Sequence, residues 1–509
     1  MKRRASKMGA AELREHLGHP VIDADGHLIE TAPVFGQYLH DYVRDIGGSD
    51  LANRIGEVLD FDETVLRPWS RMTDEEQRAA WTTRPPWWSH PAAASLDRAT
   101  GHLPRLMYER LDDLGIDFAV LYPSRTLTTT AIREDELRQV ACRALNAFNA
   151  EVYAEFQDRM TVVAHIPTHT PEEAIAALDH AVLDLGFKAI MFNGLVHRPI
   201  GDPNRENQGR FHWGSGSGDR LDTLGLDSEY DYDPFWARCV ELKVAAATHT
   251  PGQGWGSRRS ISSYMYNHIG SFAASMEAIC KSLFMGGVTR RFPELSFGLL
   301  EGGVGWACTL YADIVGHWKK RNRDTIGDLD PAKLDTELVM QLFEKYGGDR
   351  FNADPDAIRT FFSKLEPEPP TLDEWSACEI DRLEDIRDLF VPSFYFGCEA
   401  DDPSVAWAFN ERTNPAGAKL RAMFSSDMSH WDVTNMEGIL GDAYELVEEE
   451  LVDDKDFYNF VFGNPARFYT SGNPSFFEGT RCQDQVESFL AETRQSTPPP
   501  APGEPHEAA

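Results

Sequence analysis

VIDADGHLIE, from Val21 to Glu30, is the stretch of sequence from which the fold and the site can be worked out. Apolar residues lead into Asp23, Asp25 and His27, which alternate strictly with small residues. A β-strand has a side-chain period of two, so we expect these three side chains on the same face. Two carboxylates and an imidazole are unfavourable to bury together unless a cation or a substrate lies among them. Taken alone, the segment fits a metal site and a polar strand end that caps the next helix equally well.

The composition describes a chain with a large core and a strongly acidic surface. Of its 509 residues 42% are hydrophobic, and 82 acidic against 49 basic residues give a formal net charge of -33. The hydrophobic content excludes global disorder. The negative charge repels phosphate backbones and anionic bilayers, so we expect neither nucleic acid nor a membrane as a partner.

Cysteine usage and the amino-terminal sequence indicate a cytoplasmic protein. The seven Cys are odd in number and form no CxxC pair, so we expect reduced thiols. MKRRASKMGAAELREHLGHP begins with basic residues but lacks the apolar core of a secretory signal. No stretch approaches the roughly 20 apolar residues that are needed to span a bilayer.

Seven further apolar segments follow, separated by stretches with helical periodicity. They are IDFAVLYPS (116–124), TVVAHIP (161–167), FKAIMFN (187–193), VAAATHT (244–250), LSFGLLEGG (295–303), SFYFGCEA (393–400) and LRAMFSSDMSH (420–430). Near-continuous apolar strands are typical of a parallel sheet that is buried on both faces. Eight such strands alternating with helices predict an α/β fold, a distorted (β/α)8 TIM barrel. An open doubly wound sheet is the alternative, but no GxGxxG turn follows the first strand.

We expect a lead-in over 1–19, the barrel over 20–485 and a disordered Pro-rich tail over 486–509, which ends in STPPPAPGEPHEAA. Three long insertions, largely helical, are expected at 31–110, 194–229 and 304–390. The first contains RPPWW at 84–88 and is more typical of a lid or cap than of disorder.

Polar residues mark the carboxyl ends of the predicted strands, where barrel enzymes carry their chemistry. Asp25 and His27 follow the first strand, His165 the third, His249 the fifth, Glu301 the sixth and Asp427 the eighth. Carboxylate and imidazole groups arriving at one end of one barrel form the mixed oxygen and nitrogen set that suits Zn²⁺, Mn²⁺ or Fe²⁺.

Several segments together resemble a known family over about residues 20–470. They are VIDADGH, ERLDDLGIDFAVLYPS, ALNAFNAEVYAEF, LGFKAIMFN, YDPFWARCVELKVAAATH, FPELSFGLLEGG, FSSDMSHWD and FGNPARFY. The chain resembles the amidohydrolase superfamily, specifically the amidohydrolase 2 branch. That branch contains aminocarboxymuconate semialdehyde, γ-resorcylate and 5-carboxyvanillate decarboxylases, with related hydrolases and hydratases.

The resemblance implies a distorted TIM barrel with one divalent metal, Zn²⁺ in the first place and Mn²⁺ or Fe²⁺ as alternatives. It assigns the metal ligands to Asp25, His27, His249 and Asp427, and gives Asp427 a catalytic role in moving protons. Asp25 stands where the family has His or Glu. Glu301 stands in Glu-Gly-Gly where the family commonly has His-Gly-Gly. As a catalytic group Glu301 can act as acid or base, but it cannot stabilise a developing anion as an imidazolium would.

Further residues have two open interpretations each. His268 is a catalytic or substrate-contacting candidate, since the family often has Asn-His in this region. His430 follows Asp427 in a segment like the family's SDxPH, with Ser429 in place of Pro, and either contacts substrate or supports the ligands. Arg258 and Arg259 would suit a substrate carboxylate, although surface arginines are commoner. His165 is a pocket residue or a core histidine.

These assignments predict an enzyme that acts on a small organic acid or cyclic compound. The reaction is hydrolysis by a metal-activated water or non-oxidative decarboxylation, and the residues leave both open. A metal-free, binding-only barrel is the alternative. The partners expected are a small-molecule substrate and a second copy of the chain, because related enzymes are often dimers.

Overall fold

The computed structural model describes residues 8–56, 67–86, 93–124, 126–199, 219–250, 255, 257–363, 373–430 and 433–496. Its parallel strands are β1 (Ile22–Leu28), β2 (Phe118–Pro123), β3 (Met160–Val162), β4 (Ala164–Ile166), β5 (Ala189–Phe192), β8 (Ala245–Thr248), β9 (Phe297–Leu299), β10 (Phe394–Glu399) and β11 (Arg421–Ser425). They pair in the orders β1-β2-β3 and β4-β5-β8-β9-β10-β11.

Two junctions turn these sheets into a closed barrel. The strand predicted at 161–167 is interrupted at Val163, so that β3 pairs with β2 and β4 pairs with β5. On the other side, the Asp427 N–H donates to the Asp25 carbonyl at 3.1 Å and the His27 N–H donates to the Met428 carbonyl at 2.9 Å. The predicted distorted (β/α)8 barrel is therefore confirmed, and the open sheet is wrong.

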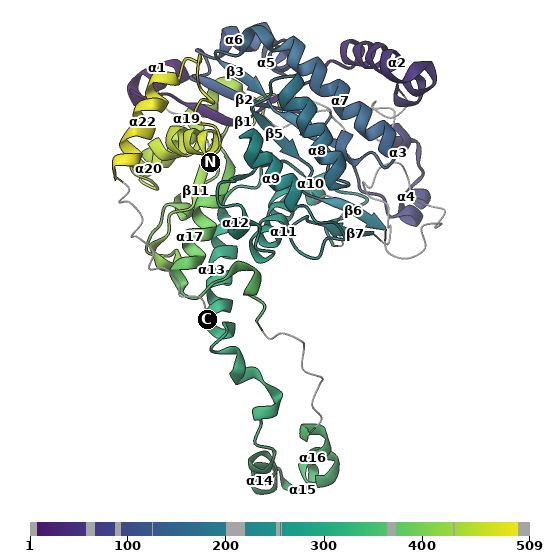
Figure 1. Ribbon diagram of the computed structural model, residues 1–509, viewed down its shortest axis with the longest axis vertical. Coiled ribbons are helices and arrows are strands. Elements are labelled where there is room, and N and C mark those ends of the chain that lie inside the picture. Colours follow the sequence, from purple (N-terminus) through teal and green to yellow (C-terminus); the bar gives the residue numbers. More distant parts are fainter. Residues whose placement is uncertain are drawn as a thin grey trace.

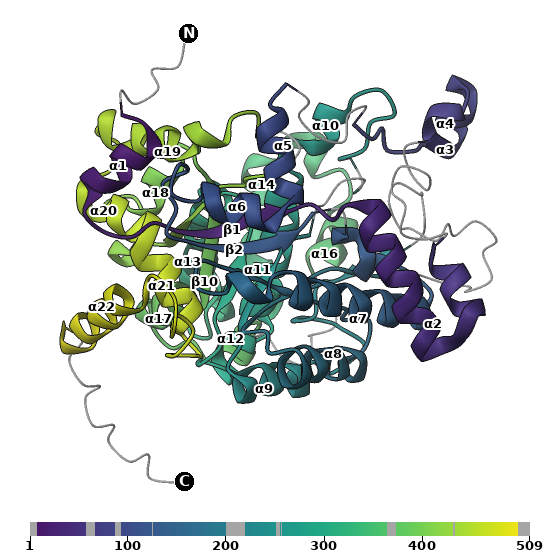
Figure 2. The same cartoon turned by 90° about the horizontal axis from the view of Figure 1, so that it is seen from above.

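Helices surround the barrel and cover its strands (Figures 1 and 2). The principal ones that follow strands are α7 (Asp135–Val152), α8 (Pro171–Asp179), α9 (Asp233–Leu242), α11 (Ser271–Met285), α13 (Gly305–Arg321), α17 (Leu383–Ser393) and α19 (Ile439–Glu448). The shorter ones are α1 (Ala10–Leu17), α12 (Val288–Arg291), α18 (Val405–Ala408), α20 (Asp454–Tyr458) and α21 (Asn464–Thr470). Local sequence sets where they begin: Thr170 caps α8 by accepting from the Glu173 N–H, and Pro171 occupies its first turn.

The strands carry apolar side chains on both faces because both faces are buried. Every residue of β2, β5, β8 and β9 is buried. One large hydrophobic core joins the strands to the surrounding helices, and a smaller one lies between α2 (Ala32–Gly56) and α7. This continuous burial holds the strand ends, and the polar groups on them, in fixed positions.

The predicted insertions differ in structure. The described part of 31–110 holds only helices: α2 (Ala32–Gly56), α3 (Arg67–Arg71), α4 (Asp74–Ala80), α5 (Ser95–His102) and α6 (Pro104–Arg110). Trp87 and Trp88 lie outside the described residues. Within the described part of 194–229, β6 (Val196–Pro199) pairs antiparallel with β7 (Asp219–Asp222), so these described residues form strands and not helices. The third insertion includes α14 (Thr336–Tyr346), α15 (Gly348–Phe351) and α16 (Pro355–Ser363), which stand away from the barrel (Figure 1).

The carboxyl-terminal boundary expected at 486 is wrong. Helix α22 (Gln483–Ser496) continues past it, and Val486 and Phe489 are buried against the core. These two apolar side chains are three residues apart and lie on one face of the helix, which explains why it packs. The sequence from 497 to the end, including the Pro-rich segment, lies outside the described residues. Among those that are described, no helix has the length and apolar character to cross a membrane.

Candidate metal centre and adjoining pocket

Strand β1 carries a bulge within the opening motif. Asp23 pairs with Ala119 but Gly26 pairs with Leu121, so three steps along β1 oppose two along β2. The strict alternation expected for Asp23, Asp25 and His27 is therefore interrupted. A bulge redirects a side chain relative to its neighbours and is common beside functional sites. It separates Asp23 from the other two.

Asp23 joins β1 to the chain beyond β11. Its carboxylate accepts from the Ser426 N–H at 2.9 Å, the Ser426 hydroxyl at 2.6 Å and the Asp25 N–H at 3.2 Å. Burial raises the pKa of Asp23 to about 6, and these hydrogen bonds oppose the shift. The buried Tyr469 hydroxyl of α21 donates to the Ala24 carbonyl at 2.7 Å, so it also supports the bulge. Asp23 is thus structural.

Two overlapping groups of metal-ligating side chains lie at the carboxyl ends of the strands. One consists of Asp25, His27 and His249, and the other of His27, Glu301, Asp427 and His430. Within each group the candidate ligand atoms all lie within 4.8 Å of one another. The four residues that the family resemblance assigns to the metal are divided between these two groups, with His27 in both, and Glu301 and His430 join the group that contains Asp427.

Short distances connect these side chains. His27 Nε2 lies 3.1 Å from Asp427 Oδ1 and 3.9 Å from Asp25 Oδ1. Glu301 Oε2 lies 2.8 Å from His249 Nε2, while Glu301 Oε1 lies 3.7 Å from His430 Nδ1. His430 Nδ1 lies 2.9 Å from Asp427 Oδ2. Glu301 therefore lies between two imidazoles.

Buried polar atoms without a hydrogen bond are concentrated here. Asp25 Oδ1, His27 Nε2, His249 Nε2 and Asp427 Oδ1 are buried and none of them makes a hydrogen bond within the described residues. Leaving such atoms unsatisfied is unfavourable by about 1–3 kcal/mol each, and more for charged groups. A divalent cation bound within either of the two groups would satisfy several of these atoms. Two carboxylates and two imidazoles are also a donor set that Zn²⁺, Mn²⁺ and Fe²⁺ accept, so the residues fit a metal.

The protonation states favour the same conclusion. Burial lowers the pKa of His249 to about 4 and lowers that of His27, so both imidazoles are neutral and able to ligate near pH 7. Burial, reinforced by Asp427 and Glu301, raises the pKa of Asp25 well above its usual range. Burial acts in the same direction on Asp427, but His430 and His27 outweigh it and lower the pKa of Asp427. A cation would offset the repulsion at Asp25.

The backbone is strained at the residues that present these groups. Glu301, Asp427 and Ser429 have φ angles of 57°, 49° and 73°, in the left-handed region that non-glycine residues rarely occupy. Such strain clusters at functional sites and persists where surrounding structure enforces it. Position 429 also explains a departure from the family pattern. Proline fixes φ near -65° and could not adopt this conformation.

Ser124 orients one imidazole. Its hydroxyl lies 3.0 Å from His27 Nδ1, which leaves Nε2 directed at the two aspartates. This is the arrangement by which a neighbouring polar group fixes the ring of a metal-ligating histidine. His430 stacks on His27 with ring centroids 4.8 Å apart and holds the other side of the ring.

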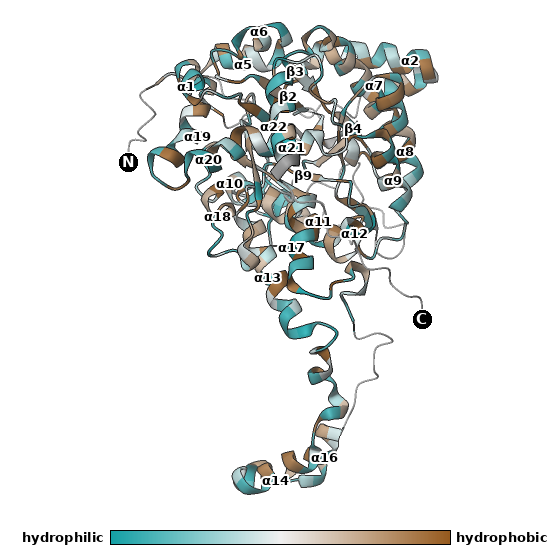
Figure 3. Cartoon of the chain, turned by 60° about the vertical axis from the view of Figure 1, so that its left-hand side comes forward, coloured by the Kyte–Doolittle hydropathy of each residue, from teal (hydrophilic) through white to brown (hydrophobic). Residues whose placement is uncertain are grey.

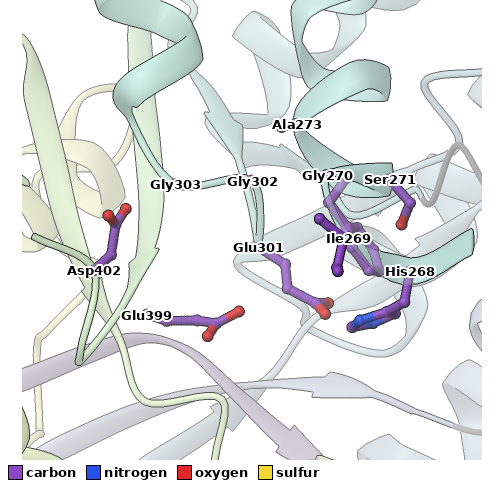
Figure 4. A pocket seen from close by; sticks show the side chains of 11 residues that line it. His268, Ile269, Gly270, Ser271, Ala273, Glu301, Gly302, Gly303, Glu399 and Asp402 are labelled. Atoms are coloured by element: carbon purple, nitrogen blue, oxygen red, sulfur yellow. The ribbon is translucent and has the colours of Figure 1, made fainter. Parts of the chain in front are cut away.

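A pocket of about 320 Å³ opens beside Glu301 (Figure 4). The residues that line it come from α10 (Tyr264–His268), the start of α11, and the chain after β9 and β10. They are His268, Ile269, Gly270, Ser271, Phe272, Ala273, Glu301, Gly302, Gly303, Glu399 and Asp402. Phe272 also packs edge-on against His249 at 5.1 Å between ring centroids. The pocket therefore borders the candidate metal centre.

The other predicted site residues are divided between the pocket and its surroundings. His268 lines the pocket, but His430 does not and lies buried against Asp427. Arg258 is exposed at the rim and its Nη1 donates to the Gly270 carbonyl at 3.3 Å. Arg259 Nη1 donates to the Trp81 carbonyl at 3.4 Å, and neither arginine lines the pocket.

His165 belongs to neither metal group. It is fully buried on β4, and the Asn146 side chain bonds its backbone N–H and carbonyl at 2.8 and 3.0 Å. Burial lowers its pKa to about 3, so it is neutral.

Three pocket residues were missed by sequence reasoning. Glu399 is the last residue of β10 and Asp402 follows it, so the rule that pointed to the other strand ends applies to them. Cys398, which precedes Glu399 on that strand, is buried, and burial raises the pKa of its thiol well above the usual range. Ser271 lies at a helix junction that carries no recognisable motif.

The family model for amidohydrolase, Amidohydro_2, matches residues 22–351. That match spans β1 to α15, including Asp25, His27, His249 and Glu301, and stops before Asp427. The comparison with curated proteins finds no match.

Several solved structures are similar at low identity. 2,6-Dihydroxybenzoate decarboxylase from Rhizobium is 15% identical, with 89% of this chain and 99% of that chain covered and a TM-score of 0.45. Dihydroxybenzoic acid decarboxylase from Polaromonas sp. JS666, with bound manganese and 2-nitroresorcinol, is 17% identical over 89% and 97%, with a TM-score of 0.46. 5-Carboxyvanillate decarboxylase from Sphingomonas paucimobilis is 12% identical over 88% and 98%, with a TM-score of 0.47. The family match, which covers more than half of the chain, shows that the chain belongs to the amidohydrolase 2 family.

Proposed function

We propose that this protein is a mononuclear metal-dependent hydrolase that acts on a small cyclic compound. Asp25, His27, His249 and Asp427 hold the ion in this proposal. The observation that carries it is that each of these residues has one buried atom without a hydrogen bond, and that Asp25 and His249 on one side and Asp427 on the other form overlapping ligand groups around His27. A binding-only barrel would have no need for charged and unsatisfied groups at this depth.

The metal we assign is Zn²⁺. Mn²⁺ and Fe²⁺ are the alternatives, and analysis of the bound metal distinguishes them from Zn²⁺. When bound, the ion would lower the pKa of water and polarise a substrate carbonyl. Asp427 is the proton acceptor in our proposal, because its lowered pKa keeps it ionised. His430 Nδ1, 2.9 Å from Asp427 Oδ2, holds that carboxylate in place. Seven unpaired thiols support a reducing, cytoplasmic compartment.

Glu301 favours hydrolysis over non-oxidative decarboxylation. Decarboxylation develops negative charge on a carbon atom, and a carboxylate beside it would oppose that charge. In hydrolysis the same carboxylate can accept a proton or direct an attacking water. Its position between His249 and His430 suits proton transfer.

Metal reconstitution followed by a substrate panel tests this proposal. The chain is loaded with Zn²⁺, Mn²⁺ or Fe²⁺ and incubated with lactones, lactams and hydroxybenzoates in ¹⁸O-labelled water. We expect ¹⁸O in the product of a lactone or lactam. We also expect a fall of at least about 1000-fold for Asp427→Asn, as for other residues of catalytic machinery, and no fall for the exposed control Asp388→Asn. Release of CO₂ from a hydroxybenzoate, without ¹⁸O incorporation anywhere in the panel, would establish the decarboxylase instead.

A further inference from the structure

The pocket beside the candidate metal centre has a strongly acidic lining. Glu301, Glu399 and Asp402 each contribute a carboxylate, and the described lining residues include no lysine or arginine. Figure 4 shows the Glu399 side chain extending toward Glu301, with His268 beyond it. Three carboxylates around one small space raise the local concentration of cations and repel anions.

A second observation shows that the pocket is built to bind a polar group. Ser271 is 1% exposed and lines the pocket, and its Oγ makes no hydrogen bond within the described residues. Buried hydroxyls are normally satisfied, so a ligand atom is the partner that this one lacks. Ile269 and Phe272, also in the lining, supply apolar surface for a ring.

We propose that the pocket receives the N–H-bearing end of a small ring compound, an amidinium, ammonium or amide group, and rejects a carboxylate. This inference rests on the proposed function, in which the pocket holds the substrate. It gives the substrate a class, a nitrogen-bearing cyclic compound instead of an aromatic acid. Glu399 and Asp402 accept hydrogen bonds from the nitrogen end, and the scissile bond lies toward Glu301 and the metal ligands.

Arg258 does not reverse this selectivity. It is exposed, it lies outside the lining, and its Nη1 is already bonded to the Gly270 carbonyl at the rim. A guanidinium that recognised a carboxylate within the pocket would need to present both of its donors there.

Binding of three matched probes tests the selectivity. Benzamidinium, benzamide and benzoate share a ring and a planar substituent but carry charges of +1, 0 and -1. Titration of metal-free protein by calorimetry prevents benzoate from ligating a metal. We expect benzamidinium to bind at least tenfold tighter than benzamide, and benzoate to bind weakest. Glu399→Gln should reduce the benzamidinium preference at least threefold, whereas its neighbour Asp401→Asn, outside the lining, should leave it unchanged.

Equal binding of benzamidinium and benzamide, or tighter binding of benzoate, would overturn the inference. Asp402→Asn is the second test variant, because Asp402 also accepts from the Ser404 N–H and hydroxyl and its loss could disturb the local turn. Metal content measured on the same samples separates the two proposals. A preference for benzamidinium without metal binding would contradict only the proposed function. Metal binding without that preference would contradict only this inference.

A different part of the molecule carries a second inference. The arm, defined as residues 326–363, contains α14, α15 and α16 and projects from the barrel (Figure 1). No residue of these helices is buried. Arg359 forms an ion pair with Glu337 and Phe343 packs edge-on against Phe362 at 5.5 Å, so α14 and α16 hold each other.

The arm carries exposed apolar residues, and Figure 3 shows hydrophobic segments on α14 and α16. Leu338, Leu342 and Tyr346 follow one another at intervals of four along α14 and are 50%, 46% and 71% exposed. Residues four apart lie on the same face of a helix, so these three form a stripe. Phe351 and Phe361 are 60% and 72% exposed on the helices beside it.

We infer that this stripe packs against the same stripe of a second copy of the chain. A two-fold axis pairs a surface with itself, so one apolar stripe suffices for both partners. Together with Phe351 and Phe361 on the helices beside it, the stripe comprises three largely exposed aromatics of about 150–250 Å² each and two leucines, which offer roughly 500–700 Å². That approaches the about 800 Å² per partner of a standard interface.

Sedimentation of the full chain tests whether the arm forms the interface between two copies. We expect a dimer at micromolar concentration for the wild type and a monomer for Leu342→Glu, with unchanged circular dichroism. Leu226→Glu is the matched control, because Leu226 is 47% exposed in a different region and should leave the dimer intact. Because both copies are acidic, association should strengthen with added salt. A monomeric wild type, or a dimeric Leu342→Glu protein, would contradict the assignment.

Discussion

Ser429 and its neighbours adopt backbone conformations that are unfavourable for stability but that position a side chain in the site. Asp427 and Ser429 both adopt left-handed φ angles, and the Ser429 hydroxyl is buried without a hydrogen bond in the described structure. The turn directs Asp427 toward His27 and His430. Non-glycine residues in this conformation are unfavourable by about 1–2 kcal/mol. The geometry of the aspartate is therefore maintained against a local conformational penalty.

Glycine at position 429 should relieve that penalty. We expect Ser429→Gly to increase the free energy of unfolding by about 0.5–1 kcal/mol, measured by urea denaturation. Ser429→Pro should lower it by more than about 2 kcal/mol, because proline cannot reach a φ of 73°. A stabilising proline would show that the turn is not held as described.

His165 makes stability depend on pH. Its pKa is lowered from 6.5 to about 3 by burial, so the folded protein binds its proton less readily than the unfolded chain does. This contribution to stability is complete above about pH 6.5 and falls as the pH decreases toward 3. At about 1.4 kcal/mol per pKa unit, the loss over that window is roughly 3–5 kcal/mol.

The comparison with His165→Gln isolates this effect. Asp23, with a raised pKa, acts in the opposite sense between about pH 4 and 6, but it is present in both proteins. In metal-free protein we expect the wild type to lose stability faster than His165→Gln as the pH falls from 6.5 to 4. If the free energies of unfolding of the two proteins fell in parallel as the pH decreased, a neutral buried His165 would be contradicted.

Among the elements, β1 shows most clearly what local sequence could and could not predict. Its apolar residues predict a strand, and the later segments predict seven more, because burial on both faces leaves a plain hydrophobic pattern. The bulge after Asp23 has no such pattern, since it depends on pairing with β2 and on Tyr469, more than 400 residues away. The pocket could not be predicted for the same reason, because Glu399 and Ser271 come together only in the folded chain.

Asp23 should contribute stability through the junction of β1 with Ser426. Asp23→Ala leaves the buried Ser426 N–H and hydroxyl without their acceptor, which should lower the free energy of unfolding by about 2–4 kcal/mol. Asp23→Asn retains one carbonyl acceptor, so we expect less than half of that loss. Denaturant midpoints of the two variants check the order. Equal effects would mean that packing, and not hydrogen bonding, makes this junction.

At the scale of the whole molecule, the barrel brings residues from both ends of the chain to one centre. His27 and Asp427 are 400 positions apart in sequence, and their side chains meet because β1 and the chain after β11 close the barrel. An ion bound between them would stabilise only the folded state. Ligand at 100 times its dissociation constant adds about 2.7 kcal/mol.

Chelation should therefore lower the melting temperature. We expect removal of metal from the wild type to lower Tm by several degrees, and readdition of Zn²⁺ to restore it. His249→Ala should unfold at the same temperature with and without chelator. A variant that still responds to chelator would place the metal elsewhere.

The most direct measurement is the metal content of the purified chain, determined by plasma mass spectrometry after reconstitution and desalting. We expect about one divalent ion per chain for the wild type and for Asp388→Asn. We expect far less than one for His249→Ala and for Asp25→Ala. A folded wild-type protein with far less than one ion per chain, after exposure to Zn²⁺, Mn²⁺ and Fe²⁺ in turn, would contradict the proposed metal centre.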